Sequence, residues 1–188
     1  MLAGLLLQPT KMFLNKSKKI AYTAVLTALG VGFIMLGAFL PLSFVPFLGA
    51  SLLLFYLFEK CGIIYGLMSG IAVSLLCVLF LGGNIAQVVP YMVLFAPHSL
   101  ASYFLNKLHI KKPFLKYLTR YLILIPLFNI SLYTIYRLAA FVLFDMNAFI
   151  HIVGAYYILA IIMSVVFILY DQAFFYIYRQ LVRARIFR

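Results

Sequence analysis

Acidic side chains are almost missing from this sequence. Only three of its 188 residues, Glu59, Asp145 and Asp171, are acidic, and charged residues of both signs make up 10% of the chain. A soluble domain of this size needs far more polar surface than this composition supplies. Since 67% of the residues are hydrophobic, the chain is predicted to be an integral membrane protein.

Several kinds of chemistry lack the residues that they require. No paired carboxylates and no nucleophile with its base can be assembled, so an intramembrane enzyme is disfavoured and no catalytic residue is assigned. The sequence has no phosphate-binding loop, and its two cysteines, Cys61 and Cys77, lack metal-like spacing. We therefore expect no cofactor and no metal. A proton-coupled carrier is also disfavoured, because it would place an acid near the middle of the membrane.

Apolar residues, in contrast, form six long segments, at 20–40, 44–58, 62–82, 85–106, 118–144 and 148–178. A spanning helix takes roughly 20 residues, and the alternating pattern of a membrane β-barrel is absent. The second segment is short, and the last is long enough to project into the cytoplasm. The predicted fold is all-α: a domain of six transmembrane helices at 20–178, with basic tails at 1–19 and 179–188. Residues 1–11 are expected to be peripheral or not to belong to the native chain.

Basic residues fill alternate connections between these segments. They are Lys11, Lys16, Lys18, Lys19, Lys60, Lys107, Lys111, Lys112, Lys116, Arg120, Arg179, Arg183, Arg185 and Arg188. The intervening connections, such as "PLSFVPF" and "LGGN", contain no lysine or arginine. Because Lys and Arg collect on the cytoplasmic side, both termini are expected on the cytoplasmic side of the cell membrane. The net charge of +12 is assigned to orientation and contact with anionic membrane lipids, not to nucleic acid.

Small residues recur at four-residue spacing in two of the segments. The first segment has Ala24, Ala28 and Gly32, and the third has Gly62, Gly66, Gly70 and Ser74. Such stripes let helix backbones approach closely in a membrane. The third-segment stripe predicts helix packing. The first-segment stripe leaves two alternatives open, which are packing within this chain and docking onto another membrane protein.

The order of these features resembles the substrate-binding S components of energy-coupling factor transporters. In that family the first helix carries an A-x-x-x-A motif, matched by Ala24 and Ala28 in "AVLTALGVG", and a glycine-rich third helix follows a short second one, matched by "GIIYGLMSG". The resemblance implies capture of a small vitamin-like solute from outside. It also implies docking through the first helix, Gly32 included, onto a transmembrane scaffold subunit that binds two ATPase subunits. The longer signatures of the riboflavin, thiamine, biotin and folate subtypes are missing, so no solute is assigned.

One different class of protein is kept as the alternative. It is a non-transport membrane scaffold, such as a rod-shape-determining protein of the MreD kind, which is thought to have a similar helical arrangement. Partner proteins discriminate between the two, because an S component should associate with ATPase subunits and such a scaffold with cell-wall proteins.

Polar residues toward the outer ends of the helices are candidates for a solute site. Arg137 lies inside the fifth apolar segment, where a charged group is costly unless it is paired or hydrated. It could line an outward-facing pocket, extend to the outer interface, or pair with Asp145. The candidate substrate-binding residues are Asn84, Gln87, Asn129, Tyr133, Arg137 and His151.

Two polar residues lie elsewhere in the apolar segments and are given structural roles. Asp171 is expected to form an ion pair with arginines of its own helix, near the cytoplasmic end. His98 is expected to pack without a ligand role, and the neighbouring Pro97 is expected to kink its helix.

Overall fold

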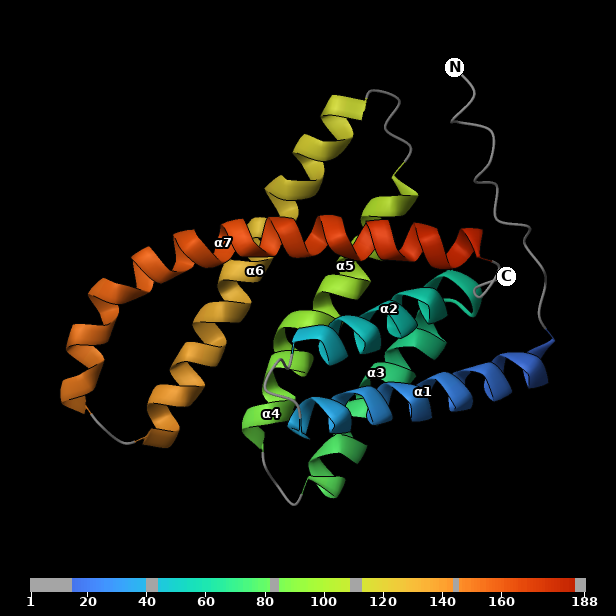
Figure 1. Cartoon of the computed structure of the whole chain (residues 1–188), viewed down its shortest axis with the longest axis horizontal. Helices are drawn as coiled ribbons and strands as arrows, with labels where there is room; N and C mark the ends of the chain where they lie inside the picture. Colours follow the sequence, from blue (N-terminus) through green and yellow to red (C-terminus); the bar gives the residue numbers. More distant parts are fainter. Residues whose placement is uncertain (1–14, 40–43, 82–84, 109–112, 144–145, 185–188) are drawn as a thin grey trace.

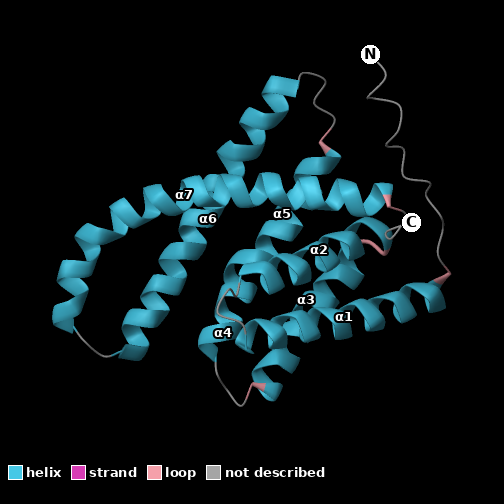
Figure 2. Cartoon of the chain, in the orientation of Figure 1, coloured by secondary structure: helices cyan, strands magenta, loops and turns pink. Residues whose placement is uncertain are grey.

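The chain folds into helices joined by short connections, as a computed structural model shows for residues 15–39, 44–81, 85–108, 113–143 and 146–184. No strand occurs among these described residues (Figure 2). The elements are α1 (Lys16–Phe39), α2 (Phe44–Lys60), α3 (Ile63–Phe80), α4 (Ile85–Pro90), η1 (Tyr91–Phe95), α5 (Ala96–Lys107), α6 (Pro113–Leu143) and α7 (Met146–Arg183). The predicted all-α class is therefore confirmed.

Five helical stretches in the described part of the chain are long and apolar enough to span a membrane. They are Lys16–Gly37, Ile63–Phe80, Val88–Lys107, Phe114–Ile135 and Ala160–Arg183. Helix α2 has 17 residues, which is at the lower limit of a spanning helix. The five apolar helices indicate a multi-pass membrane protein, whereas six spans and the orientation of the termini stay predictions.

The short helix α2 forms the centre of the helix packing. It is apolar on every side, and each residue from Ser51 to Phe58 is buried. A helix that is hydrophobic all round is expected in an interior, and α2 packs against α1, α3, α5 and α7. At its middle, Phe55 meets the rings of Phe174 and Phe175 of α7 edge to face, at centroid distances of 5.5 and 5.6 Å.

Helices α4, η1 and α5 follow one another without a break. The π-helical turn η1 lies between Pro90 and Pro97. Proline has no N–H to donate to the preceding turn, and a local π-helical turn is a common way to accommodate a disrupted ladder of hydrogen bonds. This π turn ends at Phe95, two residues before Pro97, and the kink expected at Pro97 stays a prediction.

Helices α6 and α7 are the longest elements, with 31 and 38 residues. They are consecutive in the chain and pack against each other, and α7 crosses α6 (Figure 1). Helix α7 continues to Arg183. The predicted tail from residue 179 therefore begins inside the last helix, because the helical pattern extends into its basic end.

Candidate functional site

The small residues of α1 lie on the outside of the structure. Ala24, Ala28 and Gly32 are all exposed, and a Cβ atom added at Gly32 would meet no atom within 4 Å. Another side of α1 is buried, where the hydroxyl of Thr27 lies 2.7 Å from Ser69 Oγ of α3. These three residues, which we call the α1 stripe, are thus not buried by other helices in the described part of the chain.

The small residues of α3 have the opposite environment. Gly66 is buried against α2, so closely that an added Cβ would overlap the ring of Phe58. At Gly70 an added Cβ would lie 3.7 Å from the side chain of Leu54, also in α2. The hydroxyl of Ser74 donates to the backbone oxygen of Gly70 at 2.9 Å. These glycines allow α2 and α3 to approach each other.

Gly62 has a different role from the one expected of it. It precedes α3 and adopts φ = 100°, a backbone conformation that glycine tolerates and residues with a Cβ rarely adopt. A Cβ added there would meet nothing within 4 Å. The prediction that Gly62 packs a helix interface is therefore corrected, because four-residue spacing does not distinguish a turn residue from a helical one.

The candidate substrate-binding residues are only partly covered by the structure. Asn84 lies outside the described residues, as do the side chains of Gln87 and His151. The guanidinium of Arg137 lies over the ring of Tyr133, 5.5 Å from its centroid, and both residues are exposed. Of the six candidates, these two are in contact, because they lie one helical turn apart on α6.

Asn129 is directed to a neighbouring helix. Its amide nitrogen donates to Ile125 O at 2.9 Å and to Ser164 Oγ of α7 at 3.2 Å. Asn129 therefore contributes to the contact between α6 and α7. A solute site that contains the six candidate residues stays a prediction.

A buried ionic cluster lies between α5, α6 and α7. Asp171 of α7 accepts two hydrogen bonds from Arg120 of α6, from Nε to Oδ2 at 2.8 Å and from Nη2 to Oδ1 at 2.6 Å. His98 Nε2 of α5 lies 2.9 Å from Asp171 Oδ1. The hydroxyl of Ser102 accepts from Arg120 Nη2 at 3.3 Å. We call these four residues the ionic cluster.

Aromatic rings surround the ionic cluster. The ring of His98 meets those of Phe167, Tyr170 and Phe174 at centroid distances of 5.2 to 5.3 Å. The guanidinium of Arg120 lies 4.0 Å from the centroid of Phe175. A single charge would be costly in such surroundings, whereas the guanidinium and the carboxylate compensate each other.

The ionic cluster does not have the geometry of a catalytic triad. A triad uses one ring nitrogen of its histidine for the acid and the other for the serine, but here Asp171 and Ser102 both approach His98 Nε2. Because a carboxylate only accepts, His98 Nε2 carries a hydrogen and donates it to Asp171. Nδ1 has no hydrogen-bond partner among the described residues. The arrangement joins three helices and is not suited to nucleophilic catalysis.

A second polar network joins α2 to the same helices. The hydroxyls of Ser51 in α2 and Ser99 in α5 lie 2.7 Å apart, and Tyr170 of α7 donates to Ser51 at 3.2 Å. Such bonds between buried hydroxyls satisfy polar groups that have no water to contact. The relative positions of α2, α5 and α7 are therefore fixed by directional bonds in addition to apolar packing.

Sequence reasoning assigned Asp171 to the wrong partner. Arg179 follows it by eight residues, which places it about 12 Å farther along the same helix, whereas Arg120 faces it from α6. The scarcity of acidic residues was the feature of the sequence that could have indicated the correct partner of Asp171. A basic residue that lies within an apolar helix should be tested first against each acid at a similar depth in another helix.

The described part of the chain contains no group of three or more His, Cys, Asp or Glu side chains that could hold a metal ion. No family model, curated protein or solved structure matches the sequence. The function proposed below is therefore inferred from the residues and their arrangement.

Proposed function

We propose that this chain is the solute-capturing S component of an importer of the energy-coupling factor type, located in the cell membrane. In this proposal it binds a small vitamin-like solute from outside and performs no covalent chemistry itself. It docks on a transmembrane scaffold subunit that is driven by two partner ATPases. Six spans with both termini in the cytoplasm are part of the proposal.

The exposed stripe of α1 is the observation that carries this proposal. Ala24, Ala28 and Gly32 present only small side chains on the outside, while α1 is held on its other side by α2 and α3. Between membrane helices, close backbone approach supplies dispersion contacts that drive association. A helix of a partner protein would gain such contacts on this stripe, whereas lipid chains do not require it.

The internal polar networks support the same proposal. They bind α2, α5, α6 and α7 together through buried hydrogen bonds, and α2 in turn packs against α1. A subunit that repeatedly leaves and rejoins its partner would benefit from keeping its own helices fixed while the external contact forms and breaks. The ionic cluster supplies such internal fixation without taking part in solute chemistry.

Affinity purification of the full-length chain from its native membranes, in a mild detergent, tests the proposal. We expect a multi-pass scaffold protein and two ATPase subunits to be recovered with it. Recovery of cell-wall proteins without ATPases would contradict the proposal and support the MreD-like alternative. Solute capture is tested separately by melting the purified chain with a panel of vitamins, because a ligand that binds only the folded state raises Tm.

A further inference from the structure

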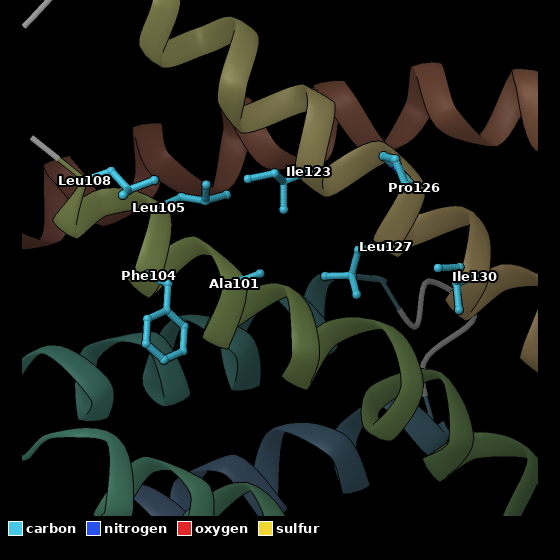
Figure 3. Close-up of a pocket in the computed structure, with 8 residues that line it drawn as sticks. All are labelled: Ala101, Phe104, Leu105, Leu108, Ile123, Pro126, Leu127 and Ile130. Atoms are coloured by element: carbon cyan, nitrogen blue, oxygen red, sulfur yellow. The ribbon is translucent and has the colours of Figure 1, made fainter. Parts of the chain in front are cut away.

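A groove of about 600 Å³ lies on the surface between α5 and α6 (Figure 3). Three of its lining residues come from α5, a fourth is Leu108 directly after α5, and four come from α6. Every lining side chain is hydrocarbon. Ala101 contributes only a methyl group to the α5 side, and Pro126 interrupts the hydrogen bonding of α6 on the other. A small residue facing a proline-containing helix leaves room that larger side chains would fill.

The dimensions of the groove suit part of a lipid chain. On α6 its lining extends from Ile123 to Ile130, which is about 10 Å along the helix axis. One leaflet of the hydrocarbon core is about 15 Å thick. An acyl chain entering from the Leu108 end would therefore remain within a single leaflet along the whole groove.

Two lysines of the described chain lie near groove-lining residues in the sequence. Arg120 also precedes the groove residues of α6, but it is buried and paired with Asp171. Lys107 is exposed and directly precedes Leu108, which lines the groove. Lys116 precedes Ile123 by seven residues, so that both lie on one face of α6, two turns apart. Lys107 and Lys116 thus adjoin the groove lining along the chain, and the ammonium of Lys107 also lies over the ring of Tyr103, 4.3 Å from its centroid.

We infer that this groove is a binding site for an anionic phospholipid. One acyl chain lies along the hydrocarbon lining between Ala101 and Ile130, and the phosphate group is bound by Lys107 and Lys116. Charge complementarity selects an anionic headgroup, because each lysine near the membrane surface attracts it. The inference concerns the α5–α6 face and is independent of the docking role proposed for α1.

Native mass spectrometry of the purified full-length protein, titrated with phosphatidylglycerol or phosphatidylcholine, tests this site. The wild type should retain phosphatidylglycerol more strongly, and Lys107→Gln and Lys116→Gln should each weaken its binding about fivefold. Ala101→Phe should reduce retention of both lipids by filling the groove. Leu122→Phe is the matched control, because Leu122 is 71% exposed on α6 but does not line the groove.

Melting curves of each variant identify any loss of folding. If Ala101→Phe does not fold, the two lysine variants still decide the outcome. Equal retention of the two lipids by the wild type would contradict the inference, as would lysine variants that retain phosphatidylglycerol normally. Unchanged retention by a folded Ala101→Phe variant, or a second copy of the chain in place of lipid, would also contradict it.

Discussion

Asp171 and Arg120 show how burial changes the contribution of an ion pair to stability. Exposed pairs contribute little to stability, but these two residues are only 2% and 8% exposed. Their attraction roughly offsets the cost of desolvation, so the pair as a whole adds little net stability. Each partner nevertheless depends strongly on the other, since removing one leaves an uncompensated charge among aromatic rings.

The Asp171→Leu variant should therefore lose about 3–5 kcal/mol of stability, because it leaves Arg120 without its counter-charge. The double variant Arg120→Met with Asp171→Leu should recover most of that loss. Thermal unfolding in detergent measures both, and Arg179→Met on the exposed side of α7 is the control. A double variant no more stable than Asp171→Leu would show that the charge compensation is unimportant.

Individual polar residues could be placed along the chain from sequence, but their partners could not. The positions of Asp171 and His98 in apolar segments were evident from the sequence alone. Which side chains face them depends on how α5, α6 and α7 rotate and cross, and hydropathy contains no such information. Asn129 illustrates the same limit, since the sequence did not indicate that its amide would contact Ser164 of α7.

At the scale of elements, α2 and α3 were predicted as apolar segments, and their helices follow those predictions closely. The second segment was expected at 44–58 and the helix occupies Phe44–Lys60. The sequence also indicated that the glycines of the third segment serve close approach. It did not indicate that α2 would be the central helix, because uniform hydrophobicity fits both a lipid-facing and a buried helix.

Substitution of two glycines distinguishes the environments of α1 and α3. Gly66→Ala should destabilise the chain by about 1–3 kcal/mol, since its Cβ would force the buried ring of Phe58 to shift. Gly32→Ala should stabilise it by roughly 0.5–1 kcal/mol, because the site is open and alanine favours the helix. Unfolding of both variants by the same protocol is the measurement. Equal effects would disagree with the packing described here.

At the scale of the whole molecule, composition and charge indicated more than any motif did. The scarcity of acids and the long apolar runs predicted a helical membrane protein, and five helices have the required length and composition. The alternation of basic connections further predicts an orientation. The count of spans depends on α2, whose 17 residues are mostly buried by other helices, and helix length alone does not decide it.

Cysteine labelling tests the predicted topology. Ser43→Cys and Asn84→Cys should react with an impermeant maleimide in intact cells, and Lys111→Cys only after permeabilisation. Background from Cys61 and Cys77 should be low, because they are 4% and 0% exposed. Burial also raises the pKa of the Cys61 thiol, in opposition to the hydrogen bond from Thr23 and the nearby lysines, which lowers its reactive thiolate fraction. Labelling of Lys111→Cys in intact cells would reject the six-span model with cytoplasmic termini.

The central claim is that the α1 stripe is a docking surface. Quantifying the ATPase subunits that co-purify with wild type, Ala24→Leu and Leu29→Trp tests it most directly. Leu29 is 51% exposed and lies about 140° around the helix from Ala24 and about 60° from Gly32, so it adds bulk beside the stripe but not on it. We predict that Ala24→Leu loses most of the ATPase subunits at an unchanged Tm, while Leu29→Trp retains them. Full recovery with Ala24→Leu, or no ATPase subunits with the wild type, would contradict the claim.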